Sequence, residues 1–197
     1  MGGQTWAAKG RVPAPEPVEH VPWMRRCLEL ARRAAEHDDA PVGSLVVRGG
    51  EVLGEGVESV VASVDPTAHA EVLAIRTAVR RAGTPDLRGC VLYTSVEPCL
   101  MCSYVIRETA IAEVVIGCPT SAPGGLGSPW PLLELEGVAG WGPPPAVLVG
   151  VLEEECRALL EARRRPGAGR DRARDAGRTG GRSGGAGPAR GRPRQSS

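Results

Sequence analysis

The chain has 197 residues, of which 42% are hydrophobic and 24% are charged. This length and apolar content predict one globular domain with a sizeable core. No apolar run reaches the length of a membrane span, and the first residues lack the basic and then apolar pattern of a signal peptide. We therefore expect a soluble, cytoplasmic protein that makes no contact with a membrane.

Charge is unevenly distributed, although the formal net charge is only +1. From Arg163 onward, eleven arginines stand against two aspartates, which gives this end about +9 and the rest about −8. Residues 166–197, rich in Gly and Arg, are predicted to be disordered. These residues either bind RNA phosphates nonspecifically or form a dispensable extension. Their composition favours the dispensable extension. Residues 1–20 are predicted to be a loose proline-containing arm, which leaves residues 21–165 as the folded domain.

The first elements expected in the folded domain are a helix and a hairpin. Apolar side chains recur at helical spacing over residues 23–37. Strand-like runs over residues 43–47 and 51–57 flank the pair Gly49 and Gly50, which is typical of a β-hairpin. The domain is therefore expected to begin with one helix and two antiparallel strands.

Helices and strands continue to alternate after the hairpin. A helix is expected over Ala68–Ala82 with Thr67 as its N-cap, so that His69 lies in its first turn. A strand over residues 91–94 leads into a helix whose first turn contains Cys99. The remaining expected elements are a strand at 113–116, a short helix near 130–135 in a long loop at 119–145, a strand at 146–149 and a helix at 152–164. This order predicts an α/β fold with helices packed on a mixed five-stranded sheet.

Two short patterns, thirty positions apart, hold residue types that bind transition metals. They are His69-Ala70-Glu71 and Pro98-Cys99-Leu100-Met101-Cys102. One imidazole and two thiolates fill three tetrahedral positions of zinc, whereas a structural site normally has a fourth protein ligand. The patterns therefore predict a catalytic zinc ion held by His69, Cys99 and Cys102, with one position open for water.

Glu71 is predicted to move protons rather than to bind the metal. It lies two positions after His69, and side chains at this spacing do not share a helix face. Zinc lowers the pKa of its bound water from about 15.7 to about 7. Glu71 would then take the proton from this water and deliver it to a ring nitrogen and to departing ammonia. The predicted chemistry is hydrolytic removal of a ring amino group.

Each pattern taken alone has a simpler interpretation. Cys99 and Cys102 could be a redox pair or half of a structural zinc site, and His69 could be an ordinary helix-start histidine. The four other cysteines lack the spacing of a secreted scaffold, so we expect reduced and mostly buried thiols. The conjunction of the His, the Glu and the Pro before the first Cys favours the catalytic zinc site.

The pattern H-x-E followed by P-C-x-x-C resembles the zinc signature of the cytidine deaminase-like superfamily. The chain is most similar to its branch of tRNA adenosine deaminases and guanine deaminases, over about Pro22–Arg164. The motifs that carry this resemblance are Trp23-Met24-Arg25, Pro41-Val42-Gly43, Gly54-Glu55-Gly56, Asp65-Pro66-Thr67-Ala68-His69-Ala70-Glu71 and Val96-Glu97-Pro98-Cys99. The resemblance implies a three-layer α/β/α sandwich and a homodimer whose partner subunit helps to wall the pocket. It also implies the zinc ligands given above and Glu71 as the proton shuttle.

Two features of the resemblance bear on the substrate. Residues 152–156 look like the tRNA deaminase terminus, which in that branch follows a fifth strand parallel to the fourth. Glu58 stands where the family commonly has an Asn that grips the base, so an acceptor-only carboxylate replaces an amide that donates and accepts. The predicted substrate contacts are Glu58, Ala70 and Pro98. The alternative for Glu58 is a solvated charge at a strand end.

Three functions fit these observations, and each of them requires a bound zinc ion. The first is hydrolytic deamination of a small nucleobase or nucleoside, guanine-like or a related amino-heterocycle, which the acidic body and Glu58 favour. The second is adenosine-to-inosine deamination in tRNA, which the terminus and the arginine-rich tail favour. The third is a zinc-stabilised RNA-binding module without turnover, which Glu71 opposes because a structural site has no use for it. We expect the first function, performed by a homodimer.

Overall fold

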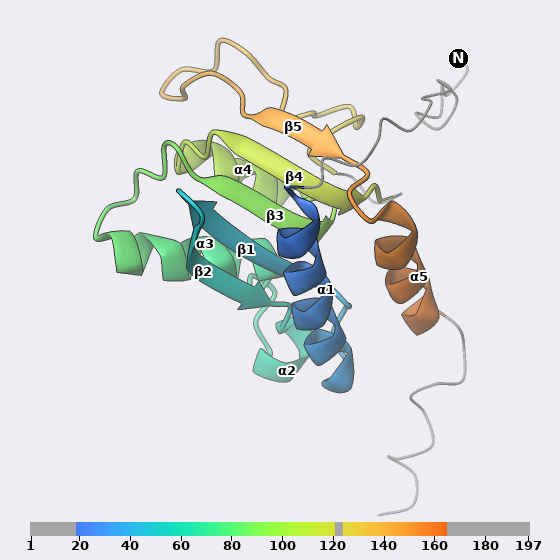
Figure 1. Ribbon diagram of the computed structural model, residues 1–197. Helices are drawn as coiled ribbons and strands as arrows, with labels where there is room; N and C mark the ends of the chain where they lie inside the picture. Colours follow the sequence, from blue (N-terminus) through green and yellow to red (C-terminus); the bar gives the residue numbers. More distant parts are fainter. Residues whose placement is uncertain (1–18, 121–123, 165–197) are drawn as a thin grey trace, which may run out of the picture. The chain divides into compact units, whose positions relative to one another are not determined.

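The computed structural model describes residues 19–120 and 124–164 (Figure 1). The predicted disordered tail at 166–197 lies outside these residues, as does the predicted arm at 1–20 except for its last two residues. None of the helices within the two described ranges combines the length and the apolarity that crossing a membrane requires.

A mixed five-stranded sheet lies at the centre of the described residues, as predicted. Its strands follow the order β2-β1-β3-β4-β5. Their bounds are Gly43–Arg48 for β1, Glu51–Val57 for β2, Val91–Val96 for β3, Glu113–Cys118 for β4 and Ala146–Val149 for β5. β1 pairs antiparallel with both β2 and β3, whereas β3, β4 and β5 run parallel. The carboxyl end of β3 therefore leads directly into the segment that carries Cys99.

Helices cover both faces of this sheet (Figure 1). The bounds of the long helices are Val21–Glu36 for α1, Ala70–Ala82 for α3, Leu100–Glu108 for α4 and Glu153–Arg164 for α5, and a short α2 spans Val60–Ser63. Leu45 and Tyr93 belong to the core beneath α1 and α5, whereas Val46 and Leu92 belong to the core beneath α3 and α4. Consecutive strand residues thus alternate between two cores. The predicted three-layer α/β/α sandwich is confirmed.

Helix α3 begins two residues later than predicted. Its first residue is Ala70 rather than Ala68, and its N-cap is His69 rather than Thr67. The hydroxyl group of Thr67 instead donates to a carboxylate oxygen of Asp65 at 2.7 Å. Such local side-chain bonds compete with helix capping, which accounts for the shifted start.

The loop between β4 and β5 contains a turn rather than the short helix predicted near 130–135. Leu133 is fully buried, and its N–H donates to the carbonyl oxygen of Gly125 at 3.1 Å. This bond joins the turn to the start of the loop. Among the described residues of the turn, the only bond of α-helical spacing runs from the N–H of Leu135 to the carbonyl oxygen of Pro131. Hydrophobic periodicity does not report which carbonyl a backbone N–H will find in the folded loop, which explains the error.

Helix α3 approaches β2 closely because the facing strand positions are glycines. A Cβ added to Gly56 would overlap the carbonyl oxygen of Ala70 and lie 2.7 Å from the nitrogen of Ala74. A Cβ added to Gly54 would lie 2.6 Å from the nitrogen of Ala78. Residues with a side chain do not fit at such distances. These two glycines therefore set how closely α3 packs against β2.

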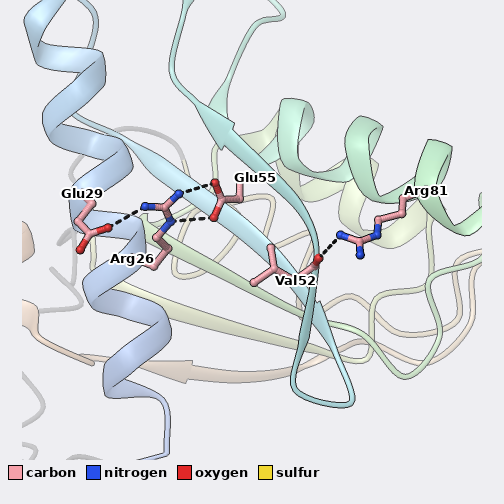
Figure 2. A network of polar contacts seen from close by, with 5 residues as sticks. All are labelled: Arg26, Glu29, Val52, Glu55 and Arg81. Carbon is pink, nitrogen blue, oxygen red and sulfur yellow. Dashed lines mark hydrogen bonds and ion pairs between the residues drawn. The ribbon is translucent and has the colours of Figure 1, made fainter.

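On the other face of β2, an arginine of α1 holds the same strand (Figure 2). Arg26 donates from Nε and Nη2 to the two carboxylate oxygens of Glu55, at 2.8 and 2.9 Å, and from Nη1 to Glu29 at 2.8 Å. The pKa of Glu55 is lowered mainly by its bond to Arg26. Strand β2 thus presents a carboxylate to α1 and glycine backbone to α3.

Candidate active site

The three predicted metal ligands come from the starts of two helices. His69 is the N-cap residue of α3 and Cys99 that of α4, both with an extended backbone. Each was predicted within a first turn and in fact precedes its helix by one residue. Cys102 lies in the first turn of α4, as predicted. The ligand atoms of the three residues lie within 4.8 Å of one another.

The distances between these atoms fit a tetrahedral zinc ion. Cys99 Sγ lies 3.6 Å from Cys102 Sγ and 3.7 Å from His69 Nδ1. Zinc bonds of about 2.3 Å to sulfur and about 2.0–2.1 Å to nitrogen place tetrahedral ligands about 3.5–3.8 Å apart. A second close group consists of Glu58, His69 and Glu71. Thiolates select zinc while carboxylates suit harder ions, so the set with two cysteines fits this metal better.

Electrostatics in the cluster favour a thiolate at Cys99. Hydrogen bonds from Cys102 and from His69 lower the pKa of Cys99 to about 4. The pKa of His69 rises to about 9, chiefly through the same bond to Cys99. The pKa of Cys102 is raised by its bond to Cys99 and by burial. The negative charge therefore lies on Cys99, and the thiolate is the form that binds metals.

Glu71 lies beside the ligands, in the first turn of α3, with only 3% of its surface exposed. One carboxylate oxygen accepts a hydrogen bond from Thr94 Oγ1 at 3.3 Å, and the other accepts one from Cys102 Sγ at 3.5 Å. Burial raises the pKa of Glu71 to about 7. Such a group can take up and release protons near neutral pH. No pattern in the sequence marked Thr94, because only the tertiary fold brings it to Glu71.

Glu58 is buried, so its interpretation as a solvated charge is wrong. The residue is 6% exposed, and its carboxylate accepts a hydrogen bond from the N–H of Ala70 at 2.8 Å. Burial raises the pKa of Glu58. Its carboxylate lies near His69 and Glu71, in the second group described above. Ala70 and Pro98 are buried as well, and contact of all three residues with substrate stays a prediction.

Glu97 holds the loop after β4 next to the ligands, a role that sequence reasoning missed. Its carboxylate oxygens accept hydrogen bonds from the backbone N–H groups of Thr120, at 3.2 Å, and Leu126, at 3.1 Å. Gly124 packs on this carboxylate with no space for a Cβ, and its backbone pairs with that of Cys99. The signal that could have identified Glu97 is its place two residues before the first cysteine.

Comparison with protein families identifies one matching model. It describes the cytidine and deoxycytidylate deaminase zinc-binding region, and it matches residues 17–118. These residues include His69, Glu71, Cys99 and Cys102. The match therefore covers the whole cluster described above.

The chain is similar to deaminases that differ in their named substrates. The tRNA-specific adenosine deaminase of Aquifex aeolicus (strain VF5) is 40% identical over 112 residues, which cover 57% of this chain and 74% of the relative. A solved structure from studies of A-to-I editing by tRNA:A34 deaminases is 30% identical, with a TM-score of 0.65, and the match covers 72% of this chain and 99% of that one. The guanine deaminase from Nitrosomonas europaea is 23% identical, with a TM-score of 0.62, over 82% of this chain and 98% of that one, which shows a shared fold.

Proposed function

Because the chain belongs to the family of the cytidine and deoxycytidylate deaminase zinc-binding region, we propose that it deaminates adenosine in a tRNA to inosine. The structural observation that carries this proposal is the C-terminal arrangement. β5 runs parallel to β4 and leads into α5, as the resemblance implies for tRNA deaminases. The relatives named for this activity are covered over 74% and 99% of their lengths. The second of the three expected functions thus becomes the preferred one.

In this proposal His69, Cys99 and Cys102 hold the zinc ion. Zinc bound there supplies a Lewis acid that makes a water molecule nucleophilic near neutral pH. The extended backbone at the two N-cap positions directs His69 and Cys99 toward a common point between the helix starts. The N-terminus of α4 also carries partial positive charge, which favours the thiolate of Cys99.

Glu71 moves the protons that the reaction requires. The oxygen of water bonds to the ring carbon that carries the amino group, and the bond from that carbon to the amino nitrogen breaks. Glu71 transfers the two protons of the attacking water in turn, the first to the ring nitrogen and the second to the leaving amine, which departs as ammonia. Thr94 Oγ1 donates to one carboxylate oxygen, which keeps the carboxylate beside the metal ligands.

The experiment that tests this function compares ammonia release from several substrates by the purified full chain. The substrates are an anticodon stem-loop containing adenosine at the wobble position, free adenosine, guanine, guanosine, cytosine and cytidine. We expect deamination of the stem-loop, with inosine detected in the product by mass spectrometry. Deamination of free bases without any inosine in the stem-loop would contradict the proposal.

A second candidate function is deamination of a guanine-like base, and Glu58 favours it. Its buried carboxylate, when ionised, only accepts hydrogen bonds, so it matches a ring that presents N–H donors, as guanine does. A buried acceptor rejects a ring lacking the donor by up to about 10⁴. Replacing Glu58 by Asn would then lower guanine turnover while leaving the stem-loop reaction less affected. Equal turnover of guanine by both proteins would exclude Glu58 from base recognition.

A further inference from the structure

The solvent-exposed face of α3 carries arginines and no carboxylate. Arg76, Arg80 and Arg81 are exposed on this helix, and its one acidic residue, Glu71, is buried in the site. The other long helices differ, because α1, α4 and α5 each place glutamates on their exposed faces. Among the long helices of the described residues, α3 is therefore the one whose exposed charged side chains are all cationic.

Two of the three arginines remain available for a partner. Arg81 reaches back to the strands, where it donates to the carbonyl oxygen of Val52 at 2.7 Å (Figure 2). It also pairs with Glu51. Arg76 and Arg80, in contrast, make no ion pair with any other residue in the described part of the chain. We call these two residues the α3 arginine pair.

The α3 arginine pair lies on a line that starts at the metal ligands. Residues four apart on a helix are neighbours on its surface. With a rise of about 1.5 Å per residue, Arg76 lies about 10 Å and Arg80 about 16 Å along the axis from His69. The pKa of Asp65 is lowered mainly by bonds from Thr67, and also by the charge of Arg76, which places Arg76 near the segment that leads into His69.

We propose that the α3 arginine pair binds phosphates of the RNA strand that flanks the reacting nucleotide. This inference rests on the proposed function and adds the surface that the polynucleotide follows. A free base is too small to extend 10 Å or more from the ligands, whereas a strand of a few nucleotides reaches that distance. The chain outside its arginine-rich end is acidic, about −8, so a local cationic face such as this one favours RNA contact within that part of the chain.

The test is binding of the anticodon stem-loop to the full chain as a function of salt concentration. The variant Arg76→Ala/Arg80→Ala removes both charges, and because alanine is the best helix former it leaves α3 intact. Arg25→Ala/Arg32→Ala is the matched control, since it removes two exposed arginines from α1 on the opposite face of the sheet. Zinc content and melting temperature confirm that all three proteins are folded.

We expect the α3 variant to bind about tenfold more weakly at about 50 mM salt, and the control to bind like the wild type. Loss of two phosphate contacts to a single strand should lower the slope of log K against log salt by about 1.4. Equal affinities and slopes for wild type and α3 variant would overturn the surface while leaving the proposed function intact. A wild type that neither binds nor deaminates the stem-loop would overturn both.

Discussion

At the scale of single residues, the site depends on two side chains that stand just before their helices. The N-cap backbone of His69 and Cys99 is extended, so each side chain projects from the helix end rather than from its flank. Cys102 follows one turn later on α4 and completes the set. Glu71 is in the first turn of α3, which explains why it lies beside these ligands although it does not belong to α4, the helix of the two cysteines.

Replacing Glu71 by Gln should preserve zinc and lower turnover by at least about 10². The amide keeps the size of the side chain but cannot accept and release the protons. The measurements are zinc content by atomic absorption and kcat with the substrate identified for the wild type. Glu36→Gln, an exposed substitution at the end of α1, is the matched control and should retain both properties. Loss of zinc in the Glu71 variant would instead make Glu71 a ligand.

At the scale of elements, the position of α3 over the sheet is set by its contact with β2. Gly54 and Gly56 face the helix backbone, and Glu55 between them is held by Arg26 of α1 from the other face. The strand is therefore fixed from both sides. Because His69 caps α3, any shift of this helix also shifts a metal ligand relative to Cys99.

Gly56→Ala should destabilise the protein by about 1–3 kcal/mol and weaken zinc binding. The added methyl group would overlap the carbonyl oxygen of Ala70, so the start of α3 must move away from β2. Urea unfolding and a competition titration with a zinc indicator measure the two effects. Gly142→Ala is the control, because a Cβ there meets nothing within 4 Å, and it should change stability by less than about 0.5 kcal/mol. Unchanged zinc affinity in Gly56→Ala would show that α3 does not position His69.

At the scale of the whole folded unit, the metal site joins two helices on one face of the sheet. α3 and α4 share the core that contains Ile75 and Ile106, and their starts meet at the ligand cluster. A metal that binds these ligands in the folded state alone adds its binding free energy to folding. The metal site therefore contributes to the stability of the fold as well as to the proposed reaction.

Removing zinc with a chelator should lower the melting temperature by about 10 °C. Binding at a thousandfold excess over Kd stabilises the folded state by about 4 kcal/mol, and each kcal/mol shifts Tm by about 2–4 °C in a domain of this size. Calorimetry with and without chelator, followed by addition of zinc, measures the effect. Cys102→Ala should lose this response, whereas Cys90→Ala, which removes a buried thiol elsewhere in the core, should keep it. An unchanged Tm after proven zinc removal would contradict the coupling.

The sequence by itself predicted the five strands, the four long helices, their order and the residues able to bind zinc. It missed the short α2 and placed a helix near 130–135, where the structure has a turn. The features predicted correctly are local: periodicity sets helices and strands, and the spacing of His69, Cys99 and Cys102 matches the donors that zinc requires. The alternation of helices and strands along the chain was also enough to predict a mixed sheet between two layers of helices. Errors remained small where only neighbouring residues decide, as in the shift of the start of α3 by two positions.

Only the tertiary structure decided which of these residues meet and which polar groups are buried. Thr94 reaches Glu71, and Glu97 holds the loop at Gly124, through contacts between segments far apart in the chain. Glu58 is buried because its carboxylate accepts the N–H at the start of α3, a contact that its place at a strand end did not reveal. Burial and pairing of this kind depend on how helices pack on a sheet, and local sequence patterns carry no information about that packing.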